Sequence, residues 1–159
     1  MLYPDFLREV FTLCKESGLG TLIDSNGSVD FENMENLLNV TDGVMLDIKA
    51  YNPSDHIKVT SVKNDMVLKN AVFLANRGKL FEVRTVVVPG LFDCRNTVYE
   101  TSKLLSPFLN ISNIRYKIIK YRKNGVRREY RSYNTPSDTE MSELEKIARD
   151  NGFNDIVII

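Results

Sequence analysis

The chain has 159 residues, the size of one ordinary domain, and its 43% hydrophobic and 26% charged residues exclude a disordered or low-complexity protein. The formal net charge is zero, which argues against capture of nucleic acid by overall charge, and no apolar run approaches the roughly 20 residues of a membrane span. The N-terminal MLYPDFLREV lacks a basic region followed by an apolar block, so we expect no secretory signal and a cytoplasmic location.

The N-terminal half alternates helical and strand signals. Apolar residues from Phe6 to Cys14 recur at helical spacing and Gly18 follows them, which predicts a helix. Cys14 lies on the apolar stripe of this helix, where we expect it to be a small buried hydrophobe. Next, LIDSNG predicts a buried strand that ends at Asp24, residues 34–38 a brief helix, and GVMLDIKA a second strand.

The C-terminal half continues the alternation. We expect a helix from Asn64 to Gly78, a third strand in LFEVRTVVVPG, a helix over residues 98–108 and a fourth strand in NIRYKIIKY. Thr135-Pro136-Ser137-Asp138 predicts a helix with a capping box and proline at its first position, which ends at Asn151-Gly152. DIVII is then a final strand and a candidate for edge pairing or aggregation.

The order of elements indicates the fold class. Helices and strands alternate to the end of the chain, and the strands are too apolar to be half exposed. This pattern predicts one α/β domain over residues 1–159, with a parallel sheet of about four strands, a short C-terminal strand, and helices over both faces. In such folds, functional groups sit at the carboxyl ends of the strands.

Polar residues follow the first two strands directly. If these strands are adjacent, Asp24 and Asp47 converge on one rim, where they could ligate a hard cation, while Lys49 could bind an anionic group such as a carboxylate. Two other interpretations stay open. Each Asp could cap the turn that follows it, and Lys49 could pair with Asp47.

Four other residues require individual interpretation. Arg84 lies inside the third strand, where its charge needs a partner, either a carboxylate such as Asp24 or Asp47 or a ligand. His56 is the only histidine; it falls in a polar stretch that we expect to be a surface loop, without a nucleophile nearby. Cys14 and Cys94 are 80 positions apart and form no short metal motif.

Residues 115–131 form a basic segment. It holds eight Lys or Arg residues against the single acid Glu129, with Tyr116, Tyr121 and Tyr130 between them. Such a mixture suits phosphate contact and base stacking, but a strand followed by a solvated loop explains it as well. No glycine-rich phosphate loop or zinc pattern accompanies it.

Four motifs together resemble one family. LIDSNG, VMLDIK, VRTVVVPG and a strand leading to YRKNGVR, with the YPDFL entry to the first helix, resemble the activating enzymes of glycyl-radical enzymes in the radical S-adenosylmethionine family. The likeness runs through nearly the whole chain. It implies a partial (β/α) barrel with helices outside, which binds S-adenosylmethionine at the carboxyl rim of its strands.

The resemblance also assigns residues to the cofactor. The triplet Asp47, Ile48 and Lys49 contacts S-adenosylmethionine, with the lysine at its carboxylate, and Arg84 is a cofactor-side group. Arg122 stands where the family commonly has histidine after the tyrosine, which makes it the corresponding candidate. A monovalent cation beside the cofactor carboxylate is assigned to Asp24, Ser25, Met45 and Asp47.

The resemblance places the family's CxxxCxxC and glycine-glycine-glutamate motifs upstream of Met1. Reductive cleavage of S-adenosylmethionine needs a [4Fe-4S] cluster on three thiolates, and Cys14 and Cys94 cannot supply them. We therefore expect no iron-sulfur ligands and no catalytic residue in this chain, which alone is inactive. The complete protein would form a 5′-deoxyadenosyl radical and install a glycyl radical on a partner such as pyruvate formate-lyase, with flavodoxin or ferredoxin as electron donor.

The same resemblance predicts an incomplete barrel without its first two strands. One sheet edge would then be unpaired, and we expect self-association through it. The alternative function is a non-catalytic binding module for an adenosyl ligand, a partner protein or, through residues 115–131, nucleic acid.

Overall fold

The structure is a computed structural model that describes residues 3–159; Met1 and Leu2, which open the predicted domain, lie outside the described residues. Its main elements are α1 (Pro4–Glu16), β1 (Leu22–Ser25), α2 (Glu35–Leu38), β2 (Gly43–Asp47), α3 (Pro53–Thr60), α4 (Asp65–Asn76), β3 (Leu80–Val87), α5 (Cys94–Leu105), β4 (Arg115–Lys120), α6 (Asp138–Asp150) and β5 (Ile156–Ile158). Three 3₁₀ turns, η1 (Phe31–Asn33), η2 (Ser106–Phe108) and η3 (Arg128–Tyr130), complete the order.

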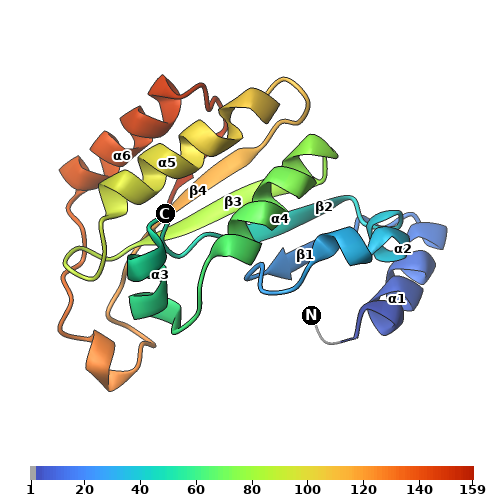
Figure 1. Cartoon of the computed structure of the whole chain (residues 1–159), viewed down its shortest axis with the longest axis horizontal. Helices are drawn as coiled ribbons and strands as arrows, with labels where there is room; N and C mark the ends of the chain where they lie inside the picture. Colours follow the sequence, from blue (N-terminus) through green and yellow to red (C-terminus); the bar gives the residue numbers. More distant parts are fainter. Residues whose placement is uncertain (1–2) are drawn as a thin grey trace.

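The five strands form one parallel sheet in the order β1-β2-β3-β4-β5, as the alternation of elements predicted. Helices α4, α5 and α6 lie on the same face of this sheet (Figure 1). Parallel strands in sequential order require right-handed crossovers, which carry every connecting helix to the same side. The prediction that helices cover both faces was therefore wrong.

The covered and the open face carry different residues. Val83 and Val87 of β3 and Tyr116 and Ile118 of β4 are buried under the helices in the main core. The alternate positions, such as Arg84 and Lys117, are paired neighbours on the other face and are partly exposed. Side chains in a strand alternate between faces, so the sheet presents one apolar and one charged surface.

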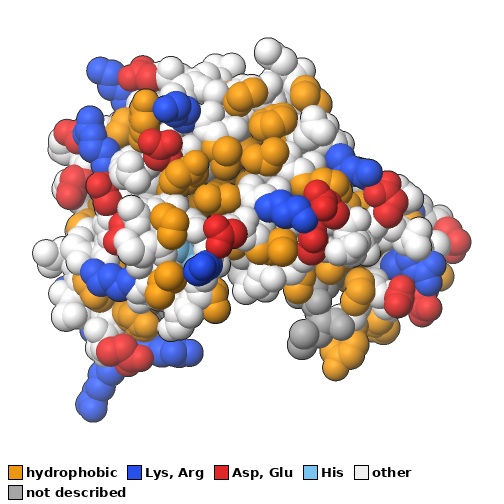
Figure 2. Space-filling view, in the orientation of Figure 1, with side chains coloured by type: hydrophobic (Ala, Val, Ile, Leu, Met, Phe, Trp, Pro, Cys, Tyr) orange, Lys and Arg blue, Asp and Glu red, His pale blue; other side chains and the backbone are white. Residues whose placement is uncertain are grey.

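The first helix is less buried than its pattern predicted. None of the α1 residues is fully buried, and Cys14, expected to be buried, is half-buried. Phe6 and Leu13 are 68% and 63% exposed. Figure 2 shows hydrophobic side chains at the surface at the lower right, where α1 lies in Figure 1.

Two helix starts differ in detail from their predictions. In α6 a capping box forms as expected, but two residues later, between Ser137 and Glu140, so that Pro136 precedes the N-cap instead of occupying the first helical position. In α4, Asn64 is at the N-cap but its side chain makes no capping hydrogen bond. Among residues 3–159, none of the helices is both long and apolar enough to cross a membrane.

Candidate functional site

The carboxyl ends of the first three strands bring Asp24, Asp47 and Arg84 together. The parallel register pairs Asp47 with Arg84 directly. Arg84 Nη2 lies 2.7 Å from Asp24 Oδ1, and Arg84 Nε lies 3.5 Å from Asp47 Oδ1. One guanidinium therefore joins two carboxylates from two different strands, on the open face of the sheet.

Lys49 extends this arrangement. Its Nζ donates a hydrogen bond of 2.7 Å to Asp47 Oδ2, and both side chains are partly exposed. The sequence left open whether Lys49 pairs with Asp47 or binds an anion, and in the structure it makes the ion pair. Asp24, Arg84, Asp47 and Lys49 form a chain of alternating charges, which we call the rim network.

Glu82 is a further member of this face that the sequence reasoning missed. Its side chain is 2% exposed, and Glu82 Oε1 lies 3.5 Å from Arg84 Nε and 3.6 Å from Lys117 Nζ. Its other oxygen, Oε2, lies 3.9 Å from Arg115 Nη1. The alternation of Glu82 and Arg84 with Val83 and Thr85 in FEVRT was the signal that could have identified it.

The surroundings of Arg84 stabilise its protonated, charged form. Partial burial disfavours the charged form, but the close ion pair with Asp24 and the charges of Asp47 and Glu82 outweigh it. They hold the pKa of Arg84 above its ordinary value. The guanidinium is thus a permanent cation at the rim.

Arg84 occupies the position between the two carboxylates where the monovalent cation was expected. Met45 is the register neighbour of Asp24, and the Ser25 hydroxyl accepts a hydrogen bond of 3.0 Å from Gly27 N. Within the part of the chain that the structure describes, no three His, Cys, Asp or Glu side chains gather as a metal site. A cation here would have to share the carboxylate oxygens with Arg84.

The side chains of two other predicted cofactor residues, Ile48 and Arg122, make no contact with the ion pairs of the rim network among the described residues. The Ile48 side chain is fully buried in the core, and its backbone N–H donates to Arg84 O at 2.9 Å. Any ligand contact of Ile48 would therefore come from its backbone carbonyl, which also accepts from Thr85 Oγ1 at 3.2 Å. Arg122 is exposed beyond the end of β4, and no hydrogen bond or ion pair joins it to another residue within 3–159.

The expectation for His56 was wrong. His56 lies in α3 and is only 3% exposed, with Nδ1 2.9 Å from Val62 O and 3.0 Å from Thr60 Oγ1. Helix α3 begins at Pro53, where the Asn52 side chain accepts from two backbone N–H groups. The NPSD sequence carries this N-cap and proline signal, which could have revealed the helix.

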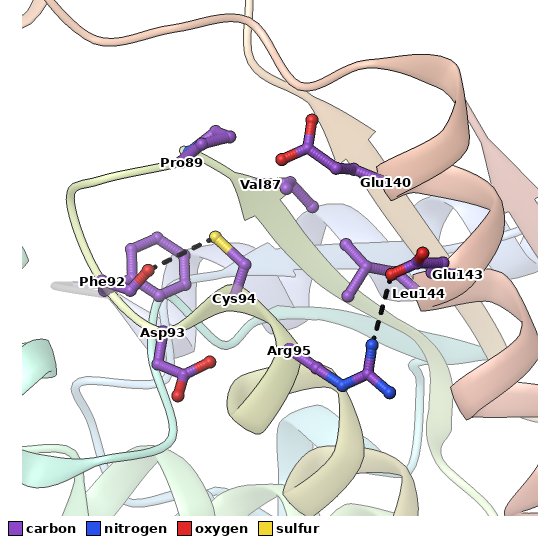
Figure 3. A pocket seen from close by; sticks show the side chains of 9 residues that line it. All are labelled: Val87, Pro89, Phe92, Asp93, Cys94, Arg95, Glu140, Glu143 and Leu144. Carbon is purple, nitrogen blue, oxygen red and sulfur yellow. Dashed lines mark hydrogen bonds and ion pairs between the residues drawn. The ribbon is translucent and has the colours of Figure 1, made fainter.

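Two cavities open near the carboxyl ends of the strands. The larger, about 560 Å³, lies beside the rim network and is lined by Leu7, Phe11, Leu22, Ile23, Asp24, Ser25, Asn26 and Asp47. The smaller, about 250 Å³, lies between β3, α5 and α6 around Cys94 (Figure 3). Only the larger one reaches the predicted cofactor residues.

The cavity around Cys94 holds a protonated thiol. Burial raises the pKa of Cys94 to about 11, so the thiolate is scarce at neutral pH. Figure 3 shows the sulfur directed toward the Phe92 carbonyl, 3.6 Å away. Cys14 lies 80 positions earlier in the chain, on helix α1, which packs on α2. The two cysteines do not fit a [4Fe-4S] cluster, which needs three thiolates together.

The basic segment exposes the cations that follow β4 and buries two of its three tyrosine rings. Tyr116 and Tyr121 are buried, and the Tyr121 hydroxyl donates to Tyr130 O at 2.6 Å. Blue side chains project at the lower left in Figure 2, where η3 lies in Figure 1. Base stacking requires accessible rings, so the buried tyrosines do not support the interpretation of this segment as a nucleic-acid surface.

Curated relatives resemble the chain over most of its length. Pyruvate formate-lyase-activating enzyme of Listeria monocytogenes serovar 1/2a is 28% identical, over 92% of this chain and 64% of the relative. The enzyme of that name from Streptococcus mutans is 35% identical, over 78% of this chain and 49% of the relative. The chain thus spans between about half and two-thirds of the length of these relatives. No family model matches it.

Solved structures share the fold. A domain of pyruvate-formate lyase-activating enzyme from Bacteroides vulgatus superposes with a TM-score of 0.84, over 99% of this chain and 92% of that chain, at 18% identity. Streptococcus suis SuiB bound to S-adenosylmethionine gives 0.70, over 96% of this chain and 36% of that one, at 13% identity. A radical SAM methyltransferase from Sphaerobacter thermophilus gives 0.66, over 99% and 46%, at 14% identity. The partial barrel is therefore the fold of this chain.

Proposed function

We propose that this chain, a relative of the pyruvate formate-lyase-activating enzymes of the radical S-adenosylmethionine group, supplies the cofactor-binding rim of such an enzyme. The observation that carries the proposal is the rim network. Its residues Asp24, Asp47, Lys49 and Arg84 meet at the carboxyl ends of β1 to β3, beside the cavity of about 560 Å³.

The chemistry of the rim matches that of the ligand. S-adenosylmethionine carries a carboxylate, an ammonium group and a sulfonium cation, and a site for it needs charges of both signs. Lys49 and Arg84 would bind the carboxylate, and Asp47 would hold the cationic part, with Ile48 contributing backbone contacts. Arg122, exposed at the end of the neighbouring strand, belongs to the same rim. A monovalent cation on Asp24, Ser25, Met45 and Asp47 would neutralise these acids whenever Arg84 turns to the ligand.

The complete protein is proposed to be a glycyl-radical activating enzyme. When bound, a [4Fe-4S] cluster supplies the electron that cleaves S-adenosylmethionine, but Cys14 and Cys94 do not fit one. The 159-residue chain would therefore bind the cofactor and position it without cleaving it. The cluster, the glycyl-radical partner and an electron donor such as flavodoxin or ferredoxin belong to the activity of the complete protein.

Calorimetric titration with S-adenosylmethionine tests the rim. We expect the parent to bind and the Asp47→Ala and Lys49→Ala variants to bind about tenfold more weakly or worse, because each loses a charged contact. Lys103→Ala is the matched control, since Lys103 lies on α5 over the Tyr99 ring, 5.6 Å from its centroid. No heat from the parent, or parent-like affinity of both rim variants, would reject the proposal. Repeating the titration in potassium and in lithium salts tests the cation.

A further inference from the structure

Helix α4 buries two side-chain amides that point to different loops. Asn64 and Asn70 are 1% and 0% exposed. Buried amides lower stability unless they are hydrogen bonded, and Asn has poor helix propensity in the interior of a helix. Both side chains bond to backbone outside their own helix, so the reason for their presence lies in those loops.

Asn70 holds the loop that follows β1. Its Nδ2 donates to the Gly27 carbonyl at 2.9 Å and to the Val29 carbonyl at 2.6 Å. Its Oδ1 accepts from Phe31 N at 3.1 Å. One side chain thus satisfies three backbone groups within five residues, and this loop begins directly after Asp24 and Ser25.

Asn64 holds the loop that follows β2 through its amide nitrogen alone, since its Oδ1 is buried without a hydrogen-bond partner. Its Nδ2 donates to the Ala50 carbonyl at 3.2 Å and to the Tyr51 carbonyl at 2.6 Å. These carbonyls come one and two residues after Lys49. The N-cap position of α4 therefore serves the neighbouring loop in place of its own helix.

Two further contacts join α4 to the first loop. A Cβ on Gly27 would lie only 3.1 Å from Val67 Cγ1, so the loop backbone packs directly on the helix. At the surface, Lys69 Nζ lies 3.0 Å from Asp30 Oδ2 and 2.8 Å from Glu32 Oε2. The loop is thus fixed to α4 by hydrogen bonds, packing and charge.

We propose that Asn70 and Asn64 are positioning residues for the rim network. By fixing the loops that leave β1 and β2, they set where Asp24 and Asp47 stand relative to Arg84. The consequence for ligand affinity rests on the proposed function, because it assumes that the rim binds S-adenosylmethionine. The positioning of the loops themselves does not depend on it.

The experiment combines hydrogen exchange with titration by S-adenosylmethionine. Asn70→Leu removes all three hydrogen bonds at similar volume, and Asn64→Ala removes the pair at the second loop. Asn151→Leu is the control, because its amide donates to Ser102 Oγ and Ile147 O, both at 3.0 Å, at the carboxyl end of α6. Circular dichroism verifies that each variant is folded at the temperature of the measurement.

We expect amide exchange over residues 27–31 to accelerate about tenfold in Asn70→Leu. We also expect the affinity of the folded variant for S-adenosylmethionine to fall about tenfold. A residue that only stabilises the fold would leave that affinity unchanged. Asn64→Ala should weaken binding with faster exchange over residues 49–51, and Asn151→Leu should match the parent in both measurements.

The outcomes separate the two proposals. The positioning role would be overturned if the parent binds S-adenosylmethionine and the folded Asn70→Leu and Asn64→Ala variants match it in affinity and in loop exchange. A parent that does not bind would reject the proposed function, and exchange over residues 27–31 would still decide on Asn70. If Asn70→Leu does not fold, Asn64→Ala alone decides in the same way.

Discussion

Arg84 is the residue on which the charges of the open face depend. It lies 2.7 Å from Asp24 and 3.5 Å from both Asp47 and Glu82, and its side chain is only 16% exposed. Without its guanidinium, Asp24 would lose its ion-pair partner, and Asp47 and Glu82 would each keep only the cations of neighbouring Lys or Arg side chains. A polar group in a valine-rich strand is therefore explained by its partners on neighbouring strands.

Replacing Arg84 should expose this dependence. We expect Arg84→Met to lower the free energy of unfolding by about 1–3 kcal/mol at pH 7, because it removes one of the cations around the buried Glu82 and the ion-pair partner of Asp24. Urea unfolding of the parent and the variant at pH 7 measures the loss.

The control for this prediction is Arg95→Met. Arg95 forms an ion pair of 3.3 Å with Glu143, but its side chain is 70% exposed. Exposed pairs contribute about 0–1 kcal/mol, so the control should change stability little. Equal losses in the two variants would contradict a special role for Arg84 in holding the sheet together.

At the scale of elements, the loop after β1 depends on close packing against α4 and β2. Gly27 has a φ of +70°, and a Cβ there would lie 2.9 Å from Leu46 Cδ1 and 3.3 Å from Val67 Cα. The turn pair Asn26-Gly27 indicated a turn from the sequence. The neighbours that also require the absence of a side chain come from two other elements.

Comparing Gly78 with Gly27 separates the requirement for a positive φ from the requirement for space around the Cβ. Gly78→Ala introduces strain alone, because its φ is +65° and nothing lies within 4 Å of the added Cβ; we expect a loss of about 1–2 kcal/mol. Gly27→Ala adds overpacking of about 1–3 kcal/mol to a similar strain. Urea unfolding of both variants gives the difference. Equal losses would mean that the loop moves away from α4 without resistance.

At the scale of the molecule, one end of the sheet is rich in exposed apolar surface. Strand β1 is an edge strand, and its Leu22 is 42% exposed. Phe6, Leu13 and Leu19 nearby along the chain are more than half exposed. An unpaired strand edge beside apolar side chains favours association with another chain.

We expect the isolated chain to self-associate through this end. In sedimentation velocity, the average mass should rise with concentration, and Phe6→Lys with Leu13→Lys should weaken association by about tenfold or more, because burial of a large apolar side chain contributes about 1.5–3 kcal/mol. Val62→Lys is the control, since Val62 is 56% exposed in the connection between α3 and α4. A parent that stays monomeric at high concentration would contradict this expectation.

Local sequence patterns determined the elements of this protein and the chemistry at the ends of its strands. Helical spacing, turn residues and valine-rich runs predicted all five strands and most helices, because these signals act within a few residues. The ordered motifs around Asp24, Asp47 and Arg84 also indicated the family. Because strand ends in a parallel sheet meet at one rim, the convergence of Asp24 and Asp47 followed from the sequence, whereas the partner of Arg84 stayed open between a carboxylate and a ligand.

Only the tertiary structure decided which surface each element presents. Valine-rich strands suggested two covered faces, whereas the crossovers place α4, α5 and α6 on one face and leave Glu82 and Arg84 on the other. The burial of His56 likewise depends on how α3 packs. The loop contacts of Asn64 and Asn70 join residues that are distant in sequence. Periodicity reports that a side chain has an apolar or polar environment, but its partners are set by how the strands and helices pack.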